Sequence, residues 1–101
     1  MMKNELLKII NTRMGRVELK LDGLEVDTVS EFISKSTEEE LASLGYSLLF
    51  IMPTSSKKEI ISLFKKNTSV NRMTSKDKMV GMKLLNALRS NNLTRAKSLI
   101  V

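Results

Sequence analysis

The segment 76–90 constrains the fold of this chain more than any other part of its sequence. At about 100° per residue, its apolar side chains cover most of the circumference of a helix and leave only a narrow polar wedge. These side chains are Met79, Val80, Met82, Leu84, Leu85, Ala87 and Leu88. A helix with so little polar surface lies at the centre of a fold or against a partner. We therefore expect a central helix capped by Ser75, and a homodimer formed through it is an alternative.

An Asp-Gly pair, Asp22-Gly23, stands between two short segments in which apolar and polar residues alternate. The segment 17–21 precedes the pair and the segment 24–26 follows it. Strict alternation around Asp-Gly predicts a β-hairpin with a two-residue type I′ turn, which needs positive φ at both central residues. We expect a small antiparallel hairpin over about 16–27, with its apolar face covered by helices.

Short helices are predicted over much of the remaining chain. Apolar spacing and capping residues place them at 3–14, 29–35, 37–44, 57–66 and from 93 to the end. Gly15 and Gly45 are the expected stops of the first and third of these helices. Thr28 and Ser36 each begin a segment with the spacing of a capping box, in which a glutamate follows three residues later.

The segment 46–52 is short, apolar and bounded by Gly45 and Pro53. We favour a buried strand here, and a continuation of the preceding helix through Gly45 is the alternative, because periodicity cannot separate the two over so few residues. The polar segment 67–75 is the longest expected loop. These elements predict a helix-dominated α+β fold in a single compact domain over residues 1–101, without a linker.

The charge of the chain is divided unevenly between its two halves. Residues 1–50 have six basic and nine acidic side chains, a net charge of −3, whereas residues 51–101 have eleven basic and two acidic ones, a net charge of +9. Such asymmetry predicts contact with a polyanion or with an acidic protein surface. A solvated basic face that keeps the protein soluble is the alternative explanation.

The residue types that most enzymes use are missing. The chain has no histidine and no cysteine, so the commonest general base, thiolate nucleophiles and cysteine-bound zinc are excluded. A carboxylate hydrolase centred on Asp22, Glu25 and Asp27 is the least favoured hypothesis, because an Asp-Gly turn already explains Asp22. The four glycines are isolated and form no phosphate-binding loop. We expect a protein that is not an enzyme and that has no cofactor and no bound metal.

Partner binding is therefore the predicted function, through the basic surface of residues 57–97. The expected partner is an acidic protein or a nucleoprotein surface, and direct binding of nucleic acid phosphates is the alternative. A terminal helix-turn-helix that presents the segment after Leu93 to a groove is disfavoured against a helical hairpin that closes the core. The residues assigned to partner binding are Lys57, Lys58, Lys65, Lys66, Arg72, Met73, Lys76, Met79, Lys83, Arg89, Arg95 and Lys97.

The seven methionines allow two interpretations. Methionine is flexible and suits surfaces that adapt to a partner, so Met73 and Met79 can form an interaction patch with Arg72, Lys76 and Lys83. The alternative, which we favour from the sequence, is that methionines at 52, 79 and 82 fill irregular gaps in the core.

The segment 84–100, which begins Leu84-Leu85-Asn86 and ends Ser98-Leu99-Ile100, resembles the helix-turn-helix ends of small core proteins in tailed-phage proheads. It covers about a sixth of the chain. The resemblance implies a phage-type accessory or inhibitor protein, or a head core or scaffold protein that acts in assembly. We also expect a cytoplasmic protein that does not bind membranes, because no segment has the apolar length of a signal peptide or a membrane span.

Overall fold

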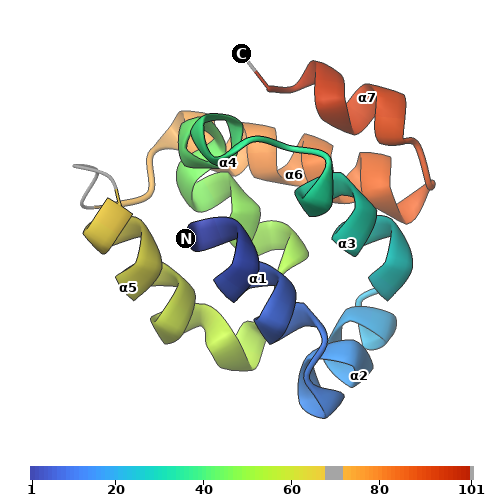
Figure 1. Cartoon of the computed structure of the whole chain (residues 1–101). Coiled ribbons are helices and arrows are strands. Elements are labelled where there is room, and N and C mark those ends of the chain that lie inside the picture. Colours follow the sequence, from blue (N-terminus) through green and yellow to red (C-terminus); the bar gives the residue numbers. More distant parts are fainter. Residues whose placement is uncertain (68–71, 101) are drawn as a thin grey trace.

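The computed structural model describes residues 1–67 and 72–100, and the regular elements in both ranges are helices (Figure 1). No strand occurs in the described part of the chain, so the predicted α+β fold is wrong and the fold is all-α. The elements are α1 (Met2–Ile10), α2 (Arg13–Leu21), α3 (Val26–Ser34), α4 (Glu38–Leu44), the 3-10 helices η1 (Gly45–Ile51) and η2 (Thr54–Ser56), α5 (Lys57–Asn67), α6 (Ser75–Arg89) and α7 (Leu93–Ser98).

The Asp22-Gly23 pair ends helix α2 and does not turn a hairpin. Gly23 has a φ of +78°, but Asp22 has a φ of −83°, whereas a type I′ turn needs positive values at both. The amide of Leu24 donates to the carbonyl of Leu19 at 2.8 Å, and that of Gly23 donates to the carbonyl of Lys20 at 3.0 Å. These two bonds form the Schellman motif, which closes a helix at a glycine. The hairpin predicted over about 16–27 is therefore wrong.

The helix predicted over 3–14 is two helices that meet at Asn11 and Thr12. The Thr12 hydroxyl accepts a hydrogen bond from the amide of Gly15 at 2.9 Å and caps α2. Gly15, the predicted stop, is instead buried inside α2, where a Cβ would collide with the carbonyl oxygen of Ile9. Glycine at this position lets α2 start close against the end of α1.

The segment 46–52 is neither the predicted strand nor a continued α-helix. It belongs to the 3-10 helix η1, which follows α4 after a change of direction at Gly45, whose φ is +53°. η1 packs against α6, and a Cβ at Gly81 would collide with the ring of Phe50. Glycine at 81 therefore allows the aromatic ring to lie directly on the backbone of α6.

Four helix starts differ from the predicted ones by one to three residues, whereas α5 and α7 begin at the predicted Lys57 and Leu93. Thr37, not Ser36, caps α4, and a full capping box joins it to Glu40. Ser36 is buried, and its hydroxyl donates to the carbonyl of Phe32 at 2.7 Å, so it is occupied at the end of α3. α6 begins with the matching box of Thr74 and Asp77, one residue before the predicted cap. α3 begins at Val26, so the predicted capping box at Thr28 lies inside this helix.

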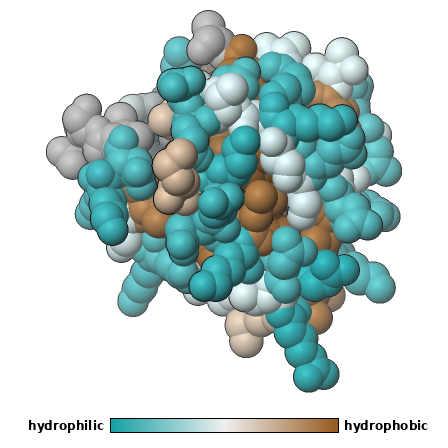
Figure 2. Space-filling view, in the orientation of Figure 1, coloured by the Kyte–Doolittle hydropathy of each residue, from teal (hydrophilic) through white to brown (hydrophobic). Residues whose placement is uncertain are grey.

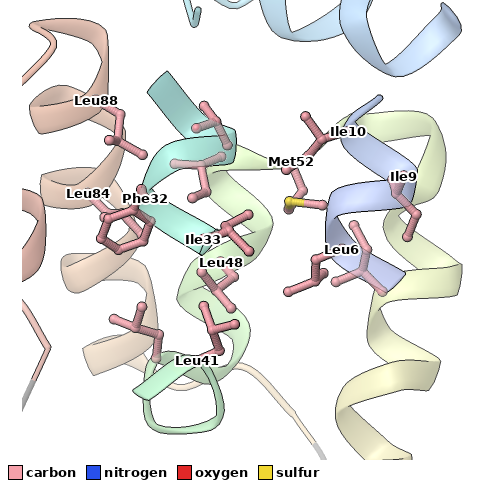
Figure 3. Packing of buried hydrophobic residues seen from close by; sticks show 14 of the residues in the cluster. Leu6, Ile9, Ile10, Phe32, Ile33, Leu41, Leu48, Met52, Leu84 and Leu88 are labelled. Atoms are coloured by element: carbon pink, nitrogen blue, oxygen red, sulfur yellow. The ribbon is translucent and has the colours of Figure 1, made fainter. Parts of the chain in front are cut away.

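Apolar side chains from both sides of η1 form the core. Figure 3 shows Leu84 and Leu88 of α6 entering it from one side and Leu6 and Ile10 of α1 from the other. All four side chains are buried, as is Leu48 of η1. α6 is thus a principal core helix, as its sequence predicts, but only one of its faces is buried.

Candidate functional site

Helix α6 has one face in the core and one face in solvent. Gly81, Leu84, Ala87 and Leu88 are buried on the inner side. On the outer side, 59% of Met79 and 49% of Met82 are exposed, and Asn86 is exposed on the same side. The hypothesis that methionines fill gaps in the core thus holds for Met52, which is buried, and fails for Met79 and Met82.

Basic side chains flank the two exposed methionines along the helix. At 3.6 residues per turn, Lys76 and Lys83 fall on one edge of the exposed surface, and Lys78 and Arg89 fall on the other. All four side chains are exposed. We call the set Lys76, Lys78, Met79, Met82, Lys83 and Arg89 the α6 outer face. It extends over about 20 Å, since thirteen residues at 1.5 Å per residue separate its ends.

The lysines of the α6 outer face outnumber the acidic residues of their own helix. No ion pair involves Lys76, Lys78 or Lys83 within the described ranges. The one acid on this helix, Asp77, is occupied at the helix start, where its carboxylate accepts hydrogen bonds from the amide and the hydroxyl of Thr74 at 2.9 and 3.0 Å. The face therefore presents uncompensated positive charge around an apolar centre.

Of the residues assigned to partner binding, Lys76, Met79, Lys83 and Arg89 lie on the α6 outer face. Sequence reasoning missed Lys78 and Met82, which lie on the same surface. A helical-wheel projection centred on Met79 would have identified both residues, because each lies within about 100° of Met79 around the helix.

Arg72 and Met73 precede α6. Arg72 is exposed, while Met73 is half-buried against the core. Met73 lines an open pocket of about 290 Å³ next to η1, with Lys57 on the same wall at the start of α5. The predicted patch of Arg72, Met73, Lys76, Met79 and Lys83 is therefore only partly a surface, since Met73 faces inward.

The other predicted cations do not join this surface in one continuous patch. Lys57, Lys58, Lys65 and Lys66 are exposed on α5, and Arg95 is exposed on α7. Figure 1 shows α5 and α7 at opposite sides of the molecule, with α6 between them at the back. Figure 2 shows that the face toward the viewer is largely hydrophilic, with apolar atoms near its centre and in smaller areas toward its edges.

Lys97 holds two helices together. Its Nζ donates to the carbonyl of Lys35 at 3.0 Å and to the hydroxyl of Ser36 at 3.3 Å, and it lies 3.6 Å from the carboxylate of Glu40. The same nitrogen lies 6.0 Å from the centre of the Phe32 ring. Because Lys35 is the C-cap of α3, the ammonium group compensates the negative end of that helix.

Arg89 has a structural contact as well as an exposed surface. Its Nε donates to the carbonyl of Asp22 at 2.8 Å, and this carbonyl belongs to the C-cap of α2. Arg89 therefore links the end of α6 to the end of α2. Its position at the rim of the α6 outer face leaves the guanidinium partly available to a partner.

The environment of Glu40 lowers its pKa below the ordinary value of about 4.5. The hydrogen bond from the amide of Thr37 is the largest cause, and the nearby charge of Lys97 acts in the same direction. Partial removal from water opposes both effects. Glu40 is a structural carboxylate at the start of α4.

The acids near Asp22 lie at the ends of two helices. Asp22 is the C-cap of α2, Glu25 is the N-cap of α3, and Asp27 lies in the first turn of α3. Glu25 and Asp27 share an open cleft of about 410 Å³ with Arg16 and Lys20. No group of three or more side chains suited to metal binding occurs among the described residues.

Comparison with known family models, curated proteins and solved structures finds no match to this chain. In the ranges that the structure describes, no helix combines the length and apolarity needed to cross a membrane.

Proposed function

We propose that this chain is a non-enzymatic binding protein that docks onto an acidic surface of another protein through the α6 outer face. One observation supports this most: two half-exposed methionines lie between basic side chains on a well-anchored helix. Protein interfaces combine such an apolar centre with a polar rim, and methionine and arginine are enriched in them. Methionine also adapts its shape to the surface that it meets.

The two kinds of side chain would contribute differently. Complete burial of an exposed methionine stabilises a complex by about 1.5–3 kcal/mol, so Met79 and Met82 can supply much of the affinity, although both are already about half-buried. Exposed lysines contribute less to affinity, and they raise the association rate and select acidic partners. Binding should therefore depend on Met79 and Met82 for its strength and on Lys76 and Lys83 for its choice of partner.

Direct binding of nucleic acid is the second candidate function. It is supported by the lysines at 76, 78 and 83, which form no ion pair within the described chain. Phosphate contacts need only such cations and leave the methionines without a role. The separation of the α5 and α7 cations in Figure 1 also argues against one continuous track for a phosphate backbone.

The experiment is affinity capture from the source cells with three variants compared with the wild type. Lys76→Glu/Lys83→Glu reverses charge on the α6 outer face, and Met79→Ser/Met82→Ser removes its apolar centre without changing charge. Lys58→Glu/Lys65→Glu is the matched control, because it makes the same charge change on the exposed side of α5. We expect an acidic protein that the wild type and the control retain and that both α6 variants lose.

Nucleic acid binding is measured in parallel with a short DNA duplex between about 50 and 200 mM salt. Steeply salt-dependent binding that survives Met79→Ser/Met82→Ser and is lost in Lys76→Glu/Lys83→Glu would replace the protein partner with nucleic acid. Capture that is unchanged in both α6 variants would refute the proposal.

A further inference from the structure

Helix α2 carries a second exposed apolar surface, separate from the α6 outer face. The exposed fractions of Met14, Val17 and Leu21 are 62%, 54% and 80%. Their spacing of three and then four residues places them in one row along the helix, the spacing at which one helix packs against another in a coiled coil. The opposite side of α2 is buried through Gly15 and Leu19. We call the exposed row the α2 seam.

One edge of the α2 seam is basic. Arg13, Arg16 and Lys20 are exposed, and on the helix they fall on the same side of the seam. No ion pair involves any of them in the part of the chain that the structure describes. On the other edge lies Glu18, whose carboxylate accepts a hydrogen bond from the hydroxyl of Ser55 at 2.7 Å and is thereby held toward η2.

The cations along one edge of the α2 seam indicate which kind of partner it can bind. An apolar row with cations along one edge is complementary to an amphipathic helix that has an acidic edge beside its own apolar row. The α6 outer face of a second copy of this chain does not fit, because it is itself basic and would repel Arg13 and Lys20. Glu25 and Asp27 line the same cleft as Arg16 and Lys20, so the acidic edge of a partner is expected over Arg13 and Lys20 and away from these two acids.

We propose that the α2 seam is a docking site for an amphipathic helix of another protein, apolar on one face and acidic along one edge. Met14, Val17 and Leu21 contact the apolar face of this helix, and Arg13 and Lys20 pair with its acidic edge. The site does not depend on the α6 outer face, so it can be tested separately.

The test uses two synthetic helical peptides of about three heptads, with leucine at positions a and d. The peptides differ at position e, on one edge of the apolar row, where one has glutamate and the other has lysine. Each is titrated into ¹⁵N-labelled full-length protein, and the shifted amides and the dissociation constant are measured by NMR. We expect the glutamate peptide to bind, with its shifts centred on α2, and the lysine peptide to bind at least about threefold more weakly.

Three variants test which residues hold the peptide. Val17→Asp and, separately, Leu21→Ser should weaken binding of the glutamate peptide about tenfold or more, because each removes apolar contact area. Arg13→Glu/Lys20→Glu should reverse the preference, so that the lysine peptide binds better. Ser62→Asp, on the exposed side of α5 and outside both proposed surfaces, is the matched control and should leave peptide binding unchanged. Circular dichroism verifies that each variant is folded.

Three results would overturn the proposal. The first is no saturable shift with the glutamate peptide at about 1 mM, which corresponds to negligible affinity. The second is equal binding of both peptides, or a preference that the charge reversal does not change. The third is a wild-type dimer in sedimentation experiments that Val17→Asp dissociates, since the occupant would then be a second copy of this chain.

Discussion

The contact between Gly81 and Phe50 determines whether Gly81→Ala raises or lowers the free energy of unfolding. A Cβ added at Gly81 would collide with three atoms of the Phe50 ring, including the ring carbon nearest the backbone. Alanine is favoured over glycine inside a helix by about 1 kcal/mol, so Gly81→Ala would stabilise α6 if there were room. Forcing an extra methyl group into a packed contact costs about 1–3 kcal/mol. The expected net effect is a loss of about 1 kcal/mol, and at most about 2 kcal/mol.

Removing the Phe50 ring should turn the loss of stability caused by Gly81→Ala into a gain. In a Phe50→Ala background the methyl group has space, so Gly81→Ala should raise the free energy of unfolding by about 1 kcal/mol. The effect of Gly81→Ala should therefore differ between the two backgrounds by about 1–3 kcal/mol. Urea denaturation of the four proteins, followed by circular dichroism at 222 nm, measures both values. A gain of about 1 kcal/mol in both backgrounds would refute the packing of η1 on α6 described above.

Three further perturbations follow from single contacts. Gly23→Ala should lower the free energy of unfolding by about 1–2 kcal/mol, measured by urea denaturation, because residue 23 has a φ of +78°. Lys97→Met should lower it by about 1 kcal/mol, since the carbonyl of Lys35 and the hydroxyl of Ser36 lose a donor; no change would show that these bonds contribute nothing. Because folding lowers the pKa of Glu40, its charged form stabilises the fold above pH 4.5, and this contribution disappears as the pH falls through the folded-state pKa. Glu40→Gln should therefore lose less stability than the wild type between about pH 5 and pH 3 in thermal melts, and an equal loss would contradict this assignment.

The helices in the second half of the chain could be predicted from its sequence. In α5, α6 and α7, the apolar spacing and the hydroxyl or amide residues near the helix starts predict the observed bounds to within about three residues. The start of α6 differed only because Thr74 and Ser75 are both good caps, and a capping box with Asp77 favours the first.

The sequence alone could not exclude the hairpin predicted around Asp22 and Gly23. An Asp-Gly pair fits a type I′ turn and also the end of a helix, because both place glycine at positive φ. Alternation of Val17, Leu19 and Leu21 suits a strand, and on α2 it places only Leu19 in the core. The deciding contacts, such as the bond from Arg89 to the carbonyl of Asp22, join residues far apart in the sequence.

The candidate sites were partly visible in the sequence. The basic charge of the second half predicts a binding surface, and Lys76, Met79 and Lys83 of the predicted set lie near one another on the exposed side of α6. Local pattern could not show that Lys97 reaches α3, nor that Met73 turns toward the core, because both depend on how the helices pack. The α2 seam was missed because the sequence predicts Val17 and Leu21 in a hairpin and Met14 in the helix before it.

The most direct test of the central claim is site-specific photocrosslinking from the α6 outer face inside the source cells. A photoreactive side chain replaces Met79 in one protein and Ser62, on the exposed side of α5, in the control. We expect position 79 to crosslink one acidic protein and position 62 to give no crosslink to it. Crosslinks from position 79 to nucleic acid alone, or an acidic protein crosslinked equally from both positions, would contradict the proposed role of the α6 outer face.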